Sequence, residues 1–202
     1  MISGPKYKIC RRLGSNVFEK CQTQKFSVSE GKKAKTGKGA KKKALSTFGQ
    51  QLLEKQKIRF SYGVSEKQFG NYVKKAVTQK GKPAGKALFD LLEARLDNVV
   101  YRLGLAKTRR LARQMVAHGH ITVNGRKVTI PSYSVTKDEV VSIREGSKSS
   151  VLFSDLPKKL KDHTSPSWLS MNAEKGEAKI VGTPGDTDSV FNWSAVLEYY
   201  SR

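Results

Sequence analysis

The chain has 202 residues, with 39 Lys and Arg against 17 Asp and Glu, which gives a formal net charge of +22. No apolar run approaches the roughly 20 residues of a membrane-spanning helix, and the first residues lack the apolar stretch of a secretory signal. We therefore expect neither a membrane protein nor a secreted or collagen-like one. A charge this large repels itself unless a polyanion neutralises it, which points to nucleic acid.

The position of the charge is more informative than its sum. Residues 1–60 carry a net charge of +13 and residues 94–155 carry +6, whereas the last 47 residues are neutral. We therefore expect the front and middle of the chain to meet the polyanion, and the neutral end to serve packing and protein contacts.

The two cysteines, Cys10 and Cys21, are too few for a structural zinc site, which needs four Cys or His ligands. The three histidines, His118, His120 and His163, are far away in the sequence. We expect no metal and no cofactor, and we expect both thiols to be free and reduced because the chain shows no export signal.

A lysine-rich segment, residues 31–43, has no acidic and no large apolar residue, so it cannot bury a core and should be disordered when free. Two interpretations remain open, a solvated linker and a basic arm that becomes ordered on phosphate. The arm would consist of Lys32, Lys33, Lys35, Lys38, Lys41, Lys42 and Lys43.

Helical patterns follow this segment. Apolar residues fall at roughly helical spacing from residue 45 and the pattern ends before Gly63. Ser65 is a suitable N-cap, and Gln68 completes a capping box. The next helix has an apolar stripe formed by Phe69, Tyr72, Val73, Ala76 and Val77.

A further helical stretch is predicted after Pro83, and Gly104 suits its C-terminal end. Its apolar residues are Leu88, Leu92, Leu96, Val99, Val100 and Leu103. The helix after it should start at the N-cap Thr108 and stop at Gly119. One of its faces is apolar (Leu111, Ala112, Met115, Val116), and the other is mostly guanidinium.

The period then changes to two. Ile121 and Val123 alternate with polar residues before Asn124-Gly125, a strong signal for a two-residue hairpin turn. Valines and isoleucines at 135–143 suggest further strands around a turn at 137–138. Trp168 and Leu169 suggest another strand start, and residues 194–200 a short closing helix.

The helix from Thr108 and the hairpin together present a basic set: Lys107, Arg109, Arg110, Arg113, Arg126 and Lys127. Arginine binds phosphate through paired hydrogen bonds, and folded RNA is read mainly through shape and backbone. A solvated helix face is the alternative. Because acidic residues are absent from 98 to 137 and the opposite face is apolar, the pattern favours RNA contact.

Residues 95–128, RLDNVVYRLGLAKTRRLARQMVAHGHITVNGRKV, closely resemble the S4 RNA-binding module, two helices followed by a small sheet with a VNG turn. That module also occurs in pseudouridine synthases, methyltransferases, tyrosyl-tRNA synthetases and a heat-shock protein, so alone it implies RNA binding only. Residues 46–73 are similar to the helical signature of the bacterial-type small-subunit ribosomal protein S4 family. ICRRLG at 9–14, PSYSV at 131–135 and the ending LEYYSR resemble the same family.

The resemblance implies an α+β fold, in which a helical domain contains an inserted S4 module with a small, mainly antiparallel sheet. The expected domains are a basic, irregular extension (1–44), a helical rRNA-binding domain (45–93, completed by a C-terminal helix at 190–202) and the inserted module with its following strands (94–189). The C-terminal helix would pack on the helical domain through Val196, Leu197 and Tyr200.

The resemblance also implies a structural role in the small ribosomal subunit, with no enzymatic activity, no membrane association and no homo-oligomer. Members of the family bind small-subunit (16S-type) rRNA directly, nucleate assembly and help to line the mRNA entrance region beside the third and fifth small-subunit proteins. By position in the family signature, the rRNA-facing residues of the helical domain would be Lys55, Lys57, Arg59, Tyr62, Lys67, Gln68, Asn71 and Tyr72.

The chain departs from the family pattern near its start. Some relatives carry four cysteines there as a zinc site, whereas Tyr7 stands where one would fall. Many relatives have a Pro-Gly-x-His-Gly loop where this chain has its lysine-rich segment. The path of residues 1–45 is therefore left open.

Asp97 could be catalytic or structural, because Arg-Leu-Asp also marks the catalytic aspartate of one class of pseudouridine synthase. No nucleotide-binding motif or catalytic constellation accompanies it here, so we expect a structural Asp97 paired with a nearby arginine. An RNA-modifying enzyme and a free RNA chaperone remain the alternatives to a ribosomal protein.

Overall fold

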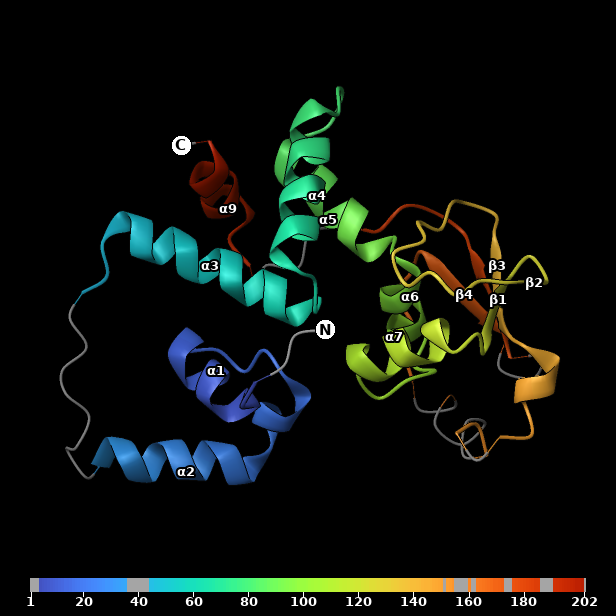
Figure 1. Cartoon of the computed structure of the whole chain (residues 1–202), viewed down its shortest axis with the longest axis horizontal. Helices are drawn as coiled ribbons and strands as arrows, with labels where there is room; N and C mark the ends of the chain where they lie inside the picture. The colour runs from blue at the N-terminus through green and yellow to red at the C-terminus, as the bar shows by residue number, and fades with distance from the viewer. Residues whose placement is uncertain are drawn as a thin grey trace. The chain divides into compact units, whose positions relative to one another are not determined.

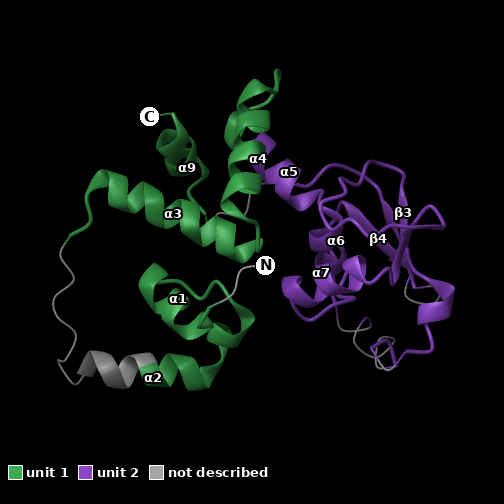
Figure 2. Cartoon of the chain, viewed as in Figure 1, with its two compact units in different colours: residues 1–85, 188–202 green, residues 86–187 purple. Residues whose placement is uncertain are grey.

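The computed structural model describes residues 4–35 (backbone only over 30–35), 44–150, 152–154, 160, 163–172, 176–185 and 191–201. The chain divides into two compact units, residues 1–85 with 188–202 and residues 86–187 (Figure 2). Figure 1 shows the order of the elements along the chain. Among the described residues, no helix has the length and apolar character that crossing a membrane requires.

The first unit begins with helices, where the sequence predicted an irregular extension. They are α1 (Lys6–Leu13), the 3-10 helix η1 (Glu19–Gln22) and α2 (Gln24–Lys35). Residues 31–35 of the lysine-rich segment continue α2, so the expected disorder is wrong for this part of it. Residues 36–43 lie outside the described part of the chain.

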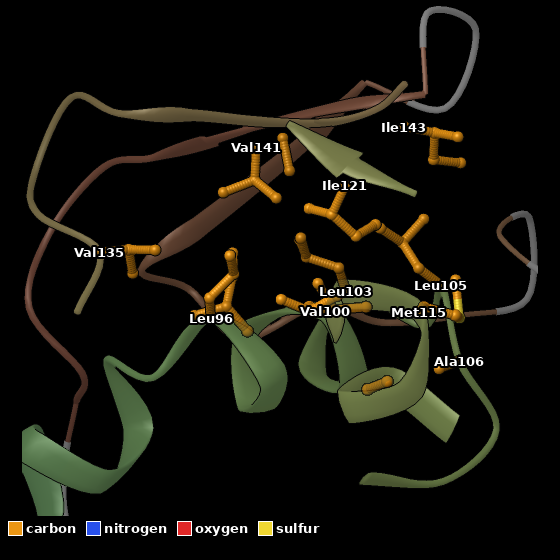
Figure 3. Close-up of a cluster of buried hydrophobic side chains, with 14 of the residues drawn as sticks. Leu96, Val100, Leu103, Leu105, Ala106, Met115, Ile121, Val135, Val141 and Ile143 are labelled. Atoms are coloured by element: carbon orange, nitrogen blue, oxygen red, sulfur yellow. The ribbon is translucent and has the colours of Figure 1, made fainter. Parts of the chain in front are cut away.

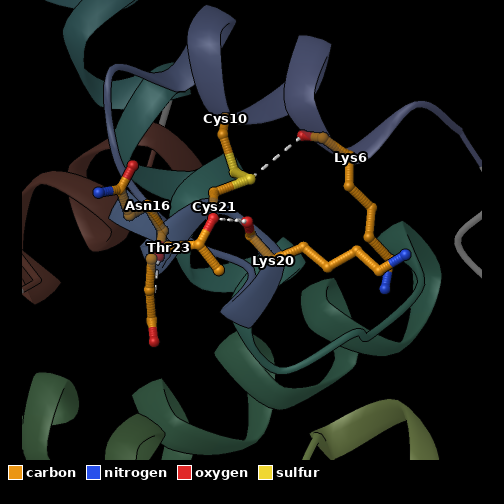
Figure 4. Close-up of a disulfide and its surroundings, with 7 residues drawn as sticks. Lys6, Cys10, Asn16, Lys20, Cys21 and Thr23 are labelled. Atoms are coloured by element: carbon orange, nitrogen blue, oxygen red, sulfur yellow. Dashed lines mark hydrogen bonds between the residues drawn. A yellow bond between two sulfur atoms is a disulfide. The ribbon is translucent and has the colours of Figure 1, made fainter. Parts of the chain in front are cut away.

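Cys10 and Cys21 form a disulfide, so the prediction of two free thiols is wrong (Figure 4). Gly14 ends α1 with a φ of 61°, and the chain turns back there toward η1. The turn brings the two Cα atoms to 6.7 Å from each other, and both cysteines are buried with Phe26 in a small cluster. This proximity depends on the turn and on the packing around it, which the number and spacing of the cysteines do not contain.

Three helices form the rest of the first unit: α3 (Thr47–Ser61), α4 (Glu66–Thr78) and α9 (Trp193–Tyr200). The predicted capping of α4 is confirmed, because the Ser65 Oγ accepts a hydrogen bond from the Gln68 amide at 3.3 Å. Phe69, Val73 and Ala76 of the predicted stripe are buried, but Val77, at its edge, is 62% exposed.

Helix α9 packs against α3 and α4, as the resemblance implied (Figure 1). Val196 is fully buried, and the ring of Tyr200 lies 6.1 Å from that of Phe69. The C-terminal helix therefore completes the apolar core of the first unit.

The second unit begins within α5 (Ala84–Glu93), which is followed by α6 (Leu96–Arg102) and α7 (Arg109–Ala117). The sequence predicted one continuous stretch in place of α5 and α6, and this is wrong because Arg95 is extended and forms an isolated bridge with Ser134. The Leu96 amide donates to the Tyr133 carbonyl at 2.8 Å, so the 131–135 segment holds the break open. Gly104 and Gly119 both have a φ of +75°, which confirms the two predicted helix ends.

A five-stranded antiparallel sheet follows, with the order β2-β1-β3-β5-β4. The strands are β1 (Ile121–Val123), β2 (Arg126–Lys127), β3 (Val140–Ile143), β4 (Leu169–Asn172) and β5 (Glu177–Ile180). Asn124 and Gly125 have positive φ values of 49° and 77°, so the predicted hairpin turn is confirmed. Strand β5 was not predicted from the sequence.

The core of the second unit lies between α6, α7 and one face of the sheet (Figure 3). Leu96 and Val100 of α6, Leu103 at its C-cap and Met115 of α7 face strand residues such as Ile121. The predicted α+β class is confirmed, and this packing fixes the outer faces of α6 and α7 relative to the hairpin.

Candidate nucleic-acid interface

Helix α7 is anchored by its cap and by its apolar face. The Thr108 Oγ1 accepts a hydrogen bond from the Leu111 amide at 3.1 Å, as predicted. Ala112, Met115 and Val116 are buried. The arginines of α7 must therefore lie on its remaining surface.

Four of the predicted RNA-binding residues of this unit are exposed. They are Lys107 before α7, Arg110 in its first turn, and Arg126 and Lys127 in the hairpin. Arg126 and Lys127 form the short edge strand β2, which pairs with β1. The hairpin therefore presents two cations from an edge strand, close to the residues of the turn.

The aliphatic stem of Lys127 packs over Gly119, at the C-terminal end of α7. A Cβ atom placed on Gly119 would collide with the Lys127 side chain. The Lys127 cation consequently lies near the negative end of the α7 dipole, a favourable position for a positive charge.

Arg113 is less exposed and pairs with Asp97, which α6 places in the interior. Its Nε and Nη2 donate to the Asp97 Oδ2 at 2.9 and 2.7 Å. The buried Arg95 donates to both oxygens of the same carboxylate, at 3.0 and 2.8 Å. The prediction that Asp97 is structural and paired with arginine agrees with this geometry.

Arg109 belongs to a second polar group. Its Nε donates to the Asn98 Oδ1 at 2.8 Å, and its guanidinium lies 4.4 Å from the centre of the Tyr101 ring. Asn98 in turn donates to the buried Glu93 carboxylate at 2.9 Å. Glu93 also accepts two hydrogen bonds from Arg102, both at 2.9 Å.

A shallow hollow of about 410 Å³ opens beside this group. Its lining includes Tyr101, Arg102, Lys107 and His163. The ring of His163 is fixed by a 2.8 Å contact between its Nε2 and the Arg102 carbonyl oxygen. Cations and aromatic rings therefore share this part of the surface.

In the first unit, some of the predicted rRNA-facing residues are buried and others lie at the surface. Lys55 and Tyr62 are both only 4% exposed, so neither can face RNA as predicted. The Lys55 ammonium donates to Glu66 at 2.7 Å and lies 4.3 Å from the centre of the Tyr199 ring. The buried Lys55 ammonium and the half-exposed Glu66 carboxylate therefore form an ion pair that joins α3 to α4, and Tyr199 adds a contact to α9.

Other members of the set lie at the surface. Lys67, Gln68 and Asn71 are exposed on α4, and Tyr72 is half-buried. The half-buried Lys57 and Arg59 are paired, Lys57 with Glu54 at 2.6 Å and Arg59 with Gln56 at 2.8 Å.

The half-exposed carboxylate of Glu66 contacts Lys55, Arg59 and Tyr200. Burial raises its pKa, but the hydrogen bonds from Lys55 and Tyr200 and the charges of Lys55 and Arg59 outweigh burial and lower it below 4.5. Burial, followed by the hydrogen bond to Glu66, raises the pKa of Tyr200.

For the basic arm, the structure gives only backbone. Lys32, Lys33 and Lys35 lie in α2, and Lys38, Lys41, Lys42 and Lys43 lie outside the described residues. Within the described ranges, no group of three or more His, Cys, Asp or Glu side chains could hold a metal ion.

Glu93, Asn98 and Arg102 were not predicted from the sequence as site residues. One signal could have identified them, because Arg95, Arg102 and Arg109 recur every seven residues beside two acids just upstream of the acid-free stretch. Glu93 lies outside the acid-free stretch from 98 to 137, so the charge pattern of that stretch gave no reason to connect it with the arginines.

The sequence matches two family models. Residues 94–141 match the S4 domain, and residues 2–93 match the ribosomal protein S4/S9 N-terminal domain. An RNA-binding module fused to a ribosomal helical domain is therefore the class that the fold and the matches define.

Relatives match nearly the whole chain. The small ribosomal subunit protein uS4 of Halothermothrix orenii is 42% identical over 204 residues, which cover 98% of each chain. The uS4 proteins of Clostridioides difficile and Roseiflexus castenholzii are 42% and 43% identical and cover 98% or more of both chains. The chain belongs to the uS4 family of small ribosomal subunit proteins, a structural family and not a family of enzymes.

Proposed function

We propose that the chain is a structural constituent of the small ribosomal subunit that binds 16S-type rRNA directly. The observation that carries the proposal is the set of exposed cations on α7 and its hairpin: Lys107, Arg110, Arg126 and Lys127. The core beneath α7 orients this set outward, and the S4 domain match covers it. Cations on a rigid surface suit the phosphate backbone of folded RNA.

The first unit supplies a second proposed contact surface. Its proposed members are the exposed Lys67, Gln68 and Asn71 and the half-buried Tyr72 of α4, together with the half-buried Lys57 and Arg59 of α3. Lys55 and Tyr62 are left out because they are buried. The lysines of the 31–43 segment remain a proposed basic arm, supported by their charge alone.

Family membership supports the finer parts of the proposal. In these, the chain nucleates subunit assembly, lies beside the third and fifth small-subunit proteins, and helps to line the region where mRNA enters. The division into an extension, a helical domain and an inserted module at residues 94–189 is part of the same proposal.

Binding to purified RNA tests the central part of this proposal. The chain should prefer small-subunit rRNA to a large-subunit rRNA fragment of equal length at moderate salt. If roughly 6–10 phosphates are contacted, affinity should fall about 10³- to 10⁵-fold between about 50 and 200 mM salt. Equal affinity for the two RNAs would contradict the proposal.

A further inference from the structure

Arg102 of α6 and Arg113 of α7 are each held by a carboxylate that lies in the protein interior. The Glu93 side chain is 1% exposed and that of Asp97 is 5% exposed. Buried ion pairs are weak contributors to stability because both charges lose water. The desolvation cost of these two pairs is better explained if they have a function in addition to stabilising the fold.

The arginines they hold reach the surface. The side chain of Arg113 is 23% exposed and that of Arg102 is 25% exposed, although each carboxylate partner is buried. In both arginines, Nε and Nη2 donate to the carboxylate, which fixes the plane of the guanidinium. The interior acid thus sets the orientation of a cation at the surface.

Asn98 connects the buried Glu93 carboxylate to Arg109 in a similar way. It is 2% exposed, with its amide nitrogen held by Glu93 and its oxygen accepting from the Arg109 Nε. The Tyr101 ring supports the Arg109 guanidinium from one face. Arg109 is therefore fixed by a relay that begins at a buried carboxylate.

We propose that Glu93, Asp97 and Asn98 are positioning residues for RNA binding, which orient the guanidiniums of Arg102, Arg109 and Arg113 before RNA arrives. This inference rests on the proposed function. A free arginine loses side-chain entropy when it meets a phosphate, and a guanidinium that is already fixed loses less. The buried acids therefore increase affinity for a polyanion although they carry negative charge.

Removing one of these acids should change RNA affinity in the direction opposite to that expected from charge alone. Removing an acid raises the net charge by one, and charge alone then predicts tighter RNA binding. Positioning predicts the opposite, because the arginine loses its fixed orientation. The two explanations are separated by the direction of a single measurement.

The experiment compares Asp97→Asn with Glu145→Gln in the full chain, using small-subunit rRNA across a salt series. Glu145 is a matched control, since its side chain is 85% exposed and it also pairs with a cation, Lys148. We expect Asp97→Asn to bind about tenfold more weakly. We expect the slope of log affinity against log salt to fall by about 0.9, the value for one lost phosphate contact. Glu145→Gln should bind as well as the unaltered chain or more tightly.

A mutant cycle shows whether Asp97 acts through Arg113. Arg113→Ala should reproduce the weaker binding and the lower slope, and Asp97→Asn added to it should change neither further. A purely structural role would lower the unfolding temperature of Asp97→Asn but would leave the affinity and slope of its folded fraction unchanged. That result, or tighter binding, would overturn the proposal.

Because Asp97→Asn leaves the buried Arg95 with less compensation, Asn98→Ala provides an independent variant. It changes no charge and retains both Glu93–Arg102 hydrogen bonds. It should weaken RNA binding in the unaltered chain and have no further effect in an Arg109→Ala background, and an unchanged affinity would refute the relay. The unaltered chain tests the proposed function separately from the positioning role. If the unaltered chain shows no preference for small-subunit rRNA, the proposed function itself is contradicted.

Discussion

Replacing Lys55 by Met separates a fold-stabilising lysine from RNA-binding ones. Methionine retains most of the aliphatic stem and removes the ammonium, which is 2.7 Å from Glu66 and 4.3 Å from the centre of the Tyr199 ring. We expect this change to destabilise the first unit and to leave RNA affinity unchanged, because Lys55 is buried.

The size of the effect follows from the partners that remain. A hydrogen bond to a charged group contributes about 1.5–3 kcal/mol, and a cation near an aromatic ring about 0.5–2 kcal/mol. The loss is smaller than the sum of these contributions for two reasons. Glu66 is half exposed and retains its contacts with Tyr200 and Arg59. The variant also avoids the desolvation cost of burying an ammonium. We therefore expect a net loss of about 1.5 kcal/mol, or about 3–6 °C in the unfolding temperature of a chain of this length.

Lys67→Met is the matched control, since Lys67 is exposed on the adjacent helix α4. Thermal unfolding and rRNA titration of both variants should give opposite results. Lys55→Met should lose stability alone, and Lys67→Met should lose affinity alone. The claim that Lys55 stabilises the fold and does not contact RNA would be refuted by two results together. The free energy of unfolding of Lys55→Met would lie within about 0.5 kcal/mol of the value for the unaltered chain, and this variant would bind RNA as weakly as Lys67→Met.

Three further outcomes are expected. The lowered pKa of Glu66 stabilises the fold above its ordinary value of 4.5 and ceases to do so as the pH falls through the lowered pKa, so Tyr200→Phe should reduce the acid dependence of urea unfolding. Gly119→Ala places a side chain at a φ of +75° and against Lys127, and chemical denaturation should show a loss of about 1–2 kcal/mol. Reducing the disulfide that joins α1 to η1 should destabilise the N-terminal part by about 2–4 kcal/mol, and hydrogen exchange of the α1 amides should report it.

Local signals in the sequence predicted much of the fold. Ser65 and Thr108 cap the helices that they were expected to cap, because a short side-chain oxygen serves the free amides of the first turn wherever it stands. The Asn124-Gly125 turn formed as predicted, because few residue pairs tolerate two successive positive φ values.

Features that depend on distant partners could not be read from the sequence. Helical periodicity continues from Leu92 to Leu96, yet the 131–135 segment bonds to the backbone between them and breaks the helix. The proximity of Cys10 and Cys21 depends on a turn and on packing, which residue counts do not contain.

The candidate site shows the same division. Arg110 is exposed on α7, as its position on the helix predicted, whereas Arg113 on the same face reaches the interior acid Asp97. In the sequence, Lys55 belongs to a basic segment, which suggested contact with RNA. In the structure, its ammonium contacts Glu66 and the rings of Tyr199 and Tyr200. Charge patterns therefore identified basic positions but did not distinguish exposed cations from cations that are paired with an acid.

Cosedimentation with ribosomal subunits tests the central claim most directly. The tagged chain, expressed in cells, should sediment with the small subunit in equal molar amount and should remain there through a high-salt wash, because a structural constituent is an integral part of the assembled subunit. A chain that is present in far less than equal amount, or that the wash removes from the subunit, would contradict the account.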